Sequence, residues 1–150
     1  RPMRMNTPLS AQITRVINQL LFLEKKSVFT YRGITLYPSE LHLMEVVAAD
    51  GGDNVTTMAQ TLGVTKGAVS QTISRLVKKR IVTKTRDPYN KNELTVQFTA
   101  TGKRAMETFA LLRADAGRRY ETYLSSLTDT ERQTIGTFLT QVEQIIADLR

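Results

Sequence analysis

The clearest chemical pattern in this 150-residue chain is a set of polar side chains that recurs every three or four residues between positions 66 and 79. This spacing places them on one face of a helix. The face carries hydroxyls, an amide and long cations but no acid, whereas ordinary exposed helix faces mix both charge signs. Its members are Gly67, Ser70, Gln71, Ser74, Arg75 and Lys78.

These residue types match the groups that DNA presents in its major groove. Glutamine pairs bidentately with adenine and arginine with guanine, so we expect Gln71 and Arg75 to contact bases. The small residues at the start of the helix let its backbone approach DNA, and the helix N-terminus with the Thr65 hydroxyl can hold a phosphate. The predicted DNA-binding residues of this helix are Thr65, Lys66, Gly67, Ser70, Gln71, Ser74, Arg75 and Lys78.

A second, shorter helix precedes this one, over about residues 57–62, and Thr56 or Thr57 is expected to cap it. Ala59 is small enough for two helices to cross closely, and Gly63 supplies the positive φ that a sharp turn between them needs. Any pair of antiparallel helices could show one of these features. Their combination predicts a helix-turn-helix unit.

The positive charge of the chain is concentrated around this unit. Ten lysines and arginines and only two acids lie between Gly63 and Arg104, whereas the rest of the chain has 11 cations and 12 anions. A localised basic patch indicates a polyanionic partner, although a charge run can also be a solvated face.

Two short strands are expected after the polar helix, at residues 81–86 and 94–98, joined by a turn-rich connection. We expect Arg86 and Lys91 to contact DNA, with Lys91 at the hairpin tip reaching the minor groove. A plain solvent-exposed turn is the alternative for the tip. The remaining expected elements are a helix at 8–26, a loop or extended link at 28–36, and helices from Pro38 to Gly51-Gly52, over 101–124 and after the capping box at Thr128.

The first and last predicted helices carry long apolar stripes. These could pack within the chain, but a small winged helix does not need two such faces, so the sequence favours a homodimer. Its two DNA-reading helices would then lie one DNA turn apart and read a palindrome. The predicted dimerisation residues are Ile13, Ile17, Leu20, Phe138, Val142, Ile145 and Leu149.

An enzyme is not expected, because the chain has no cysteine and one histidine and therefore no evident nucleophile–base pair or metal site. Glu40 and Glu45 are five residues apart and do not share a helix face. No catalytic residue, metal or cofactor is predicted. No apolar run is longer than Leu20 to Leu23, which is too short for a membrane span. No signal peptide is evident, and a cytoplasmic location fits.

Four segments carry a family resemblance: Leu36 to Met44, Val55 to Ser70, Asp87 to Lys91, and Phe98 to Gly102. They resemble the second helix, the helix-turn-helix, the wing and the entry to the fifth helix of the multiple-antibiotic-resistance-regulator (MarR) family. The resemblance implies a mainly α fold with a small β-hairpin wing, in which a winged helix-turn-helix at 37–100 stands between dimerisation segments at 1–36 and 101–150.

The sequence departs from the family pattern at three places. Asn90-Lys91-Asn92 replaces the usual Asp-Arg-Arg of the wing, which weakens the case for an acid–arginine brace there. Arg80 stands where a glycine usually follows the recognition helix. Tyr37 replaces a Thr or Ser cap, so that another group must cap the helix.

The resemblance also implies a small aromatic or phenolic effector, bound where the dimerisation region meets the DNA-binding lobe. The residues that could line its site are Phe22, Phe29, Tyr31, Arg32, Tyr37 and His42, although each can equally be an ordinary packing residue. The predicted function is therefore a homodimeric transcription regulator of double-stranded DNA, with repression favoured. The alternative is a winged helix used as a protein-interaction or scaffold module.

Overall fold

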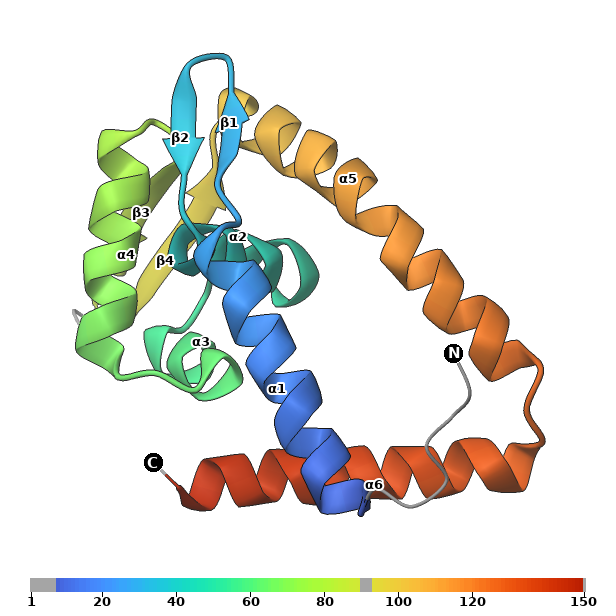
Figure 1. The fold of residues 1–150 in the computed structure, drawn as a ribbon. Coiled ribbons are helices and arrows are strands. Elements are labelled where there is room, and N and C mark those ends of the chain that lie inside the picture. Colours follow the sequence, from blue (N-terminus) through green and yellow to red (C-terminus); the bar gives the residue numbers. More distant parts are fainter. Residues whose placement is uncertain (1–7, 90–92, 150) are drawn as a thin grey trace.

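The computed structural model describes residues 8–89 and 93–149 and confirms the predicted mainly α winged-helix architecture (Figure 1). The central lobe contains three helices and an antiparallel hairpin: α2 (Pro38–Asp50), α3 (Val55–Leu62), α4 (Lys66–Lys78), β3 (Val82–Arg86) and β4 (Leu94–Phe98). The flanking elements are α1 (Leu9–Lys25), β1 (Phe29–Tyr31), β2 (Ile34–Leu36), α5 (Ala100–Ser125) and α6 (Asp129–Asp148).

The hydrophobic core lies entirely in and around the lobe. Leu43, Met44 and Leu76 are fully buried where α2 and α4 face each other, and α5 contributes Ala105 and Phe109 from its first three turns. The other large contributors are Leu36, Leu41, Met58, Val69, Ile73, Ile81, Val82 and Val96. This core fixes α4 against the body and leaves its opposite side to solvent.

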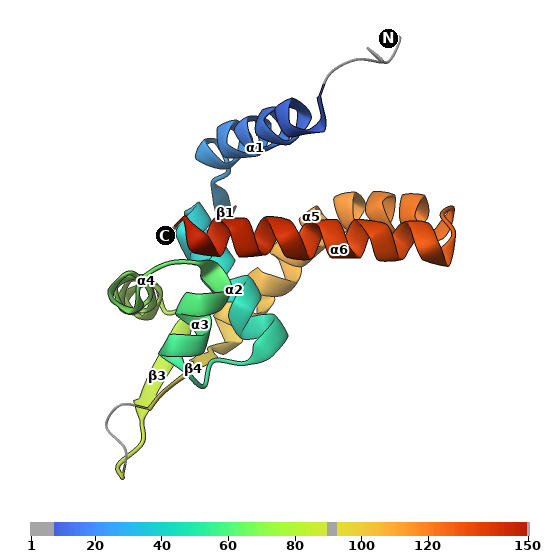
Figure 2. The ribbon, with the colours of Figure 1, turned by 90° about the horizontal axis from the view of Figure 1, so that it is seen from below.

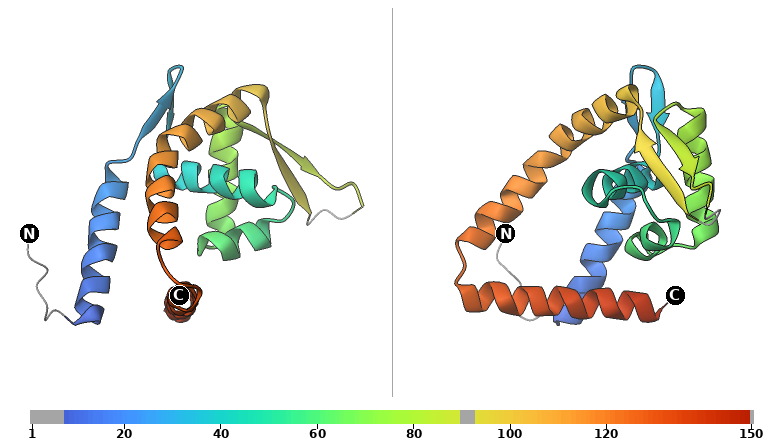
Figure 3. Two further views of the ribbon diagram at one scale, coloured as in Figure 1. Left: turned by 90° about the vertical axis from the view of Figure 1, so that its right-hand side faces the viewer. Right: turned by 180° about the vertical axis from the view of Figure 1, so that it is seen from behind.

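The helices α1 and α6 form arms that extend from the lobe. None of the described residues of either helix is buried. The two helices cross in the view of Figure 1, but Figures 2 and 3 show that they lie apart. The wing, β3 and β4, projects from the side of the lobe opposite α1. No helix within the described ranges is both long and apolar enough to cross a membrane.

The segment at 28–36, predicted to be a loop or extended link, is instead the β1–β2 hairpin. Phe29 pairs with Leu36 and Tyr31 pairs with Ile34. The turn between them has positive φ at both central residues, 46° at Arg32 and 82° at Gly33. Tight hairpin turns of this kind usually carry Asn-Gly or Asp-Gly, so the Arg-Gly pair gave no indication of a hairpin.

Helices α2 and α4 begin at Pro38 and Lys66 as predicted, whereas α3 begins at Val55, two residues before its predicted start. Asn54, rather than Thr56 or Thr57, caps α3 by accepting a hydrogen bond from the Thr57 N–H (3.2 Å). The Glu40 carboxylate caps the N-terminus of α2 by accepting a hydrogen bond from the Tyr37 backbone N–H (3.3 Å). The predicted capping box of α6 at Thr128 is present.

Candidate nucleic-acid interface

The turn between α3 and α4 has the geometry that its sequence demands. Gly63 ends α3 with φ at 70°, and the Val64 N–H donates to the Ala59 carbonyl (3.1 Å). Ala59 is buried at the crossing, where a larger side chain would push the helices apart. The turn therefore sets α4 at a fixed angle to α3.

Helix α4 has one buried and one exposed side. Its buried side consists of Val69, Thr72, Ile73 and Leu76. Thr65 caps the helix by accepting a hydrogen bond from the Ala68 N–H (3.1 Å). The exposed side carries most of the predicted DNA-binding residues, namely Thr65, Lys66, Gly67, Ser70, Gln71, Arg75 and Lys78. Ser74, also predicted, is half-buried. The helix has no acidic residue, so this surface presents donors and positive charge alone.

Arg75 is held by a contact that sequence reasoning missed. One guanidinium nitrogen, Nη2, donates to the Thr72 hydroxyl (3.0 Å) and to the Ser39 hydroxyl of α2 (3.3 Å). The side chain therefore lies along the boundary between α4 and α2 rather than pointing straight outward. No local pattern could reveal this pairing, since Ser39 is 36 residues away.

Backbone pairing holds the two strands of the wing together as far as the outer end of the ladder. Arg86 pairs with Leu94 at the outer end of the ladder, and the Asp87 N–H donates to the Glu93 carbonyl (3.1 Å). The Asp87 carboxylate accepts from the Tyr89 N–H (2.8 Å), which shapes the turn and leaves the Tyr89 side chain 99% exposed. Arg86 is exposed on this hairpin, and it makes interactions within the chain. The predicted tip residue Lys91 lies outside the described residues.

Two glycines allow the close approaches that join the wing and α5 to the lobe. The Val96 N–H donates to the Gly52 carbonyl (2.8 Å), and a Cβ on Gly52 would lie 2.1 Å from the Val96 oxygen. A Cβ on Gly102 would lie 1.9 Å from the Ile81 oxygen. Thr99 caps α5 and donates from its hydroxyl to the Arg80 carbonyl (2.6 Å). The segment from Phe98 to Gly102 thus ties α5 to the end of α4.

Comparison with known proteins finds a family whose model matches the central part of this chain. Residues 34–91, from β2 through α4 into the wing, match the model of the MarR family. This match covers the central part of the chain and less than half of its length. The family comprises transcriptional regulators rather than enzymes.

A curated relative is the uncharacterized HTH-type transcriptional regulator YvnA of Bacillus subtilis, 25% identical over 100 residues. The alignment covers 67% of this chain and 64% of YvnA, less than two thirds of that relative. Among solved structures, the adhesin competence repressor AdcR of Streptococcus pyogenes gives a TM-score of 0.75 at 16% identity, covering 94% of this chain and 99% of AdcR. Streptococcus pneumoniae FabT, solved in complex with DNA, gives 0.69 at 20%, covering 95% and 97%. These structures share the fold.

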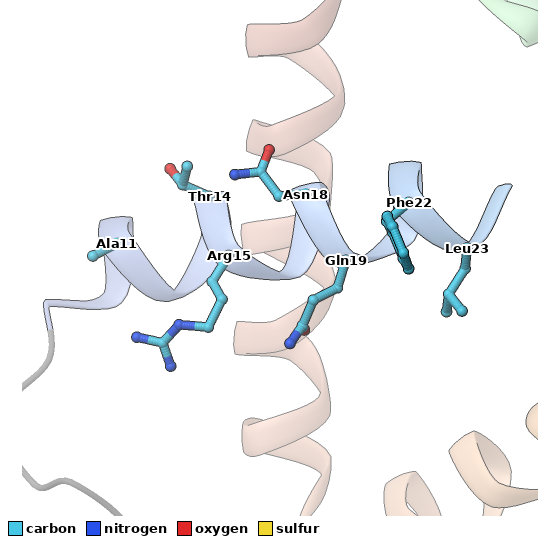
Figure 4. A pocket seen from close by; sticks show the side chains of 7 residues that line it. All are labelled: Ala11, Thr14, Arg15, Asn18, Gln19, Phe22 and Leu23. Carbon is cyan, nitrogen blue, oxygen red and sulfur yellow. The ribbon is translucent and has the colours of Figure 1, made fainter. Parts of the chain in front are cut away.

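The predicted effector residues do not converge on one site in this chain. Phe22 lies on the side of α1 that also carries Arg15 and Asn18 (Figure 4). The Lys26 ammonium lies over its ring. That face is an open helix surface rather than an enclosed pocket. Tyr31 and Arg32 belong to the β1–β2 hairpin, and the Tyr37 ring lies under Lys79, 4.9 Å from its ammonium.

Of the predicted effector residues, His42 lines a cavity of about 570 Å³ between α1, α2 and α5. Its Nε2 lies 2.8 Å from the Glu24 carboxylate at the end of α1. Arg113 lines the same cavity and lies 3.7 Å from Glu45. Phe29, also predicted, is a core residue whose ring centre lies 5.4 Å from that of Phe109, with the two rings tilted by 55°. Within the described ranges, no three histidine, aspartate or glutamate side chains gather closely enough to hold a metal ion.

Proposed function

We propose that this protein regulates transcription by binding a palindromic DNA operator as a homodimer, with α4 in the major groove and the wing over the minor groove. The observation that carries the proposal is the exposed side of α4, which contains three cations and the amide of Gln71 but no acid. The cations are Lys66, Arg75 and Lys78. Bidentate pairing by Gln71 would supply base readout, and the lysines would contact phosphates.

Dimer formation is supported by the apolar arms. In the single chain, Leu20 is 58% exposed, Ile145 57% and Leu149 81%, and Ile17 and Phe138 are also exposed. Contiguous exposed apolar surface of this kind marks a protein interface. A second copy of the chain can cover these stripes, since each copy offers the same two arms.

We further propose that the regulator is a repressor released by a small aromatic or phenolic ligand. The cavity between α1, α2 and α5 supports this, because apolar walls with a few polar groups are typical of ligand sites. Ile17, Leu20 and Phe109 supply the walls, and Arg113 and His42 supply polar groups. The fold neighbour AdcR is named as a repressor. Calorimetric titration with benzoates and phenols, followed by measurement of operator release, tests this step.

Selection from a randomised duplex pool tests the DNA-binding proposal. The expected result is an enriched near-palindrome whose affinity falls steeply with salt, by a slope of about −0.9 per neutralised phosphate. Weak binding without an enriched sequence would indicate a nonspecific role. No binding at low salt would favour the alternative of a protein-interaction module.

A further inference from the structure

The recognition helix α4 ends at a buried ion pair that the DNA-binding proposal does not use. Lys79, the residue that follows α4, places its ammonium 2.8 Å from each carboxylate oxygen of Glu40 in the first turn of α2. The Glu40 side chain is 1% exposed and the Lys79 side chain 27%. The Lys79 ammonium donates a hydrogen bond to Oε1 of Glu40. The buried Oε2 accepts no hydrogen bond and interacts with the ammonium only through charge.

The same ammonium holds two further groups. It donates a hydrogen bond to the Thr35 carbonyl of β2 (2.7 Å) and lies 4.9 Å above the centre of the Tyr37 ring. Three segments thus meet at one cation: the β1–β2 hairpin, the start of α2 and the end of α4. Figure 1 shows the hairpin beside this end of α4.

The contacts of Lys79 direct its charge into the protein. Lys79 is one of the ten cations between Gly63 and Arg104, and its partner Glu40 lies outside that stretch. Its neighbour Lys78 is exposed on α4 and has no acid on its own helix. The two adjacent lysines therefore differ in role although both belong to the basic segment.

We propose that Lys79 and Glu40 are positioning residues that set the angle of the recognition helix relative to the dimerisation arm. Helix α1 runs directly into the β1–β2 hairpin, and Lys79 holds that hairpin to the last residue of α4. Buried ion pairs add little net stability compared with apolar packing, and in some proteins they instead select one geometry. The arm, the hairpin and α4 then move as one body, so that the spacing of two recognition helices in a dimer is fixed. This inference rests on the proposed function.

Salt dependence separates positioning from phosphate contact. We expect Lys79→Met to lower affinity for the selected operator about tenfold or more, with little change on random DNA and an unchanged salt slope. Lys78→Ala, which removes one positive charge from the neighbouring position, is the matched control. It should make the slope shallower by about 0.9 and weaken binding to both DNAs. A slope change for Lys79→Met like that of Lys78→Ala would make Lys79 a phosphate contact and overturn the proposal.

A double variant and a hydrogen-exchange measurement complete the test of the positioning role. If Lys79→Met fails to fold because it leaves a buried carboxylate unpaired, Glu40→Gln/Lys79→Met removes both charges and takes its place. Hydrogen exchange without DNA should rise in the last turn of α4 and in the β1–β2 hairpin, and stay unchanged in α3. Unchanged exchange and operator affinity in a folded variant would overturn the proposal. Should the wild-type protein select no sequence, the proposed function fails and the exchange measurement alone decides this inference.

Discussion

The winged-helix lobe buries its apolar side chains within one chain, whereas the helical arms leave most of theirs exposed. In the lobe, residues such as Leu43, Met44 and Leu76 are completely buried, and each helix is held by partners from other elements. In the arms, α1 and α6 have no buried residue among those described, although both carry apolar stripes. Hydrophobic burial is the main favourable term in folding, so the lobe is stabilised within one chain, whereas the arms require a second surface.

The largest effect is expected from opening the lobe's core. Leu43→Ala should lower the free energy of unfolding by about 2–5 kcal/mol, because it removes buried methyl groups and leaves a cavity. Urea unfolding followed by circular dichroism measures this. Val64→Ala is a control in the same lobe at a position 47% exposed, and it should cost less than about 1 kcal/mol. Equal costs at the two positions would contradict the described core.

Breaking the arms should separate assembly from folding. Leu20→Asp/Ile145→Asp places charges on both apolar stripes, so sedimentation velocity should show single chains whose lobe remains folded. Operator affinity should fall about 100-fold or more, because the second half-site no longer benefits from being linked to the first. Asn18→Asp adds a charge on the polar face of α1 and should leave the dimer intact (Figure 4). A double variant that stays dimeric would refute the assignment of these stripes.

The exposed side of α4 should discriminate between DNA sequences. Gln71→Ala is expected to cost about 1–3 kcal/mol on the operator and to relax specificity at one base pair. Fluorescence anisotropy with operator and scrambled duplexes measures both. If the losses on the two duplexes are equal, Gln71 does not read a base.

A small gain in the free energy of unfolding is expected from a substitution at the end of α4. Arg80 has φ at 58°, a conformation that costs a residue with a side chain about 1 kcal/mol compared with glycine. Arg80→Gly should therefore raise the free energy of unfolding by about that amount. Arg80→Ala removes the cation without relieving the backbone and should give no gain, so that stabilisation by both variants would point to charge instead.

The smallest effect is a pH dependence in the arm α6. Hydrogen bonds from the Thr128 backbone and side chain hold the pKa of Glu131 below its ordinary value of 4.5. A lowered pKa in the folded state means that the cap stabilises α6 above that ordinary value and loses its effect as pH falls through the lowered pKa. NMR titration of the carboxyl carbon should give a midpoint below 4.5. Glu131→Gln should remove the pH dependence of amide protection in the first turn of α6.

Local signals in the sequence predicted much of the lobe. The turn at Gly63 in the lobe and the capping box at Thr128 before α6 depend on residues within a few positions, and the structure has both as expected. The periodicity of α4 also predicted which side faces solvent, because a stable helix fixes the direction of every side chain.

Contacts between distant segments could not be predicted in this way. Ser39 and Arg75 are 36 residues apart, and Glu40 and Lys79 are 39 apart. Nothing in the spacing of these residues indicates a pairing, since it exists only once α2 and α4 have packed. The β1–β2 hairpin was missed for a different reason, because its turn places Arg32 in a conformation where asparagine or aspartate is usual.

The most direct test of the account is insertion of half a helical turn of DNA, about five base pairs, between the half-sites of the selected operator. Arms that link two lobes fix the two recognition helices about one turn of DNA apart, roughly 34–36 Å. The account predicts that the insertion reduces affinity to that of a single half-site, and that a full-turn insertion does not restore tight binding, because the spacing is rigid. Unchanged affinity after the half-turn insertion would contradict the claim that the arms and α4 act as one body.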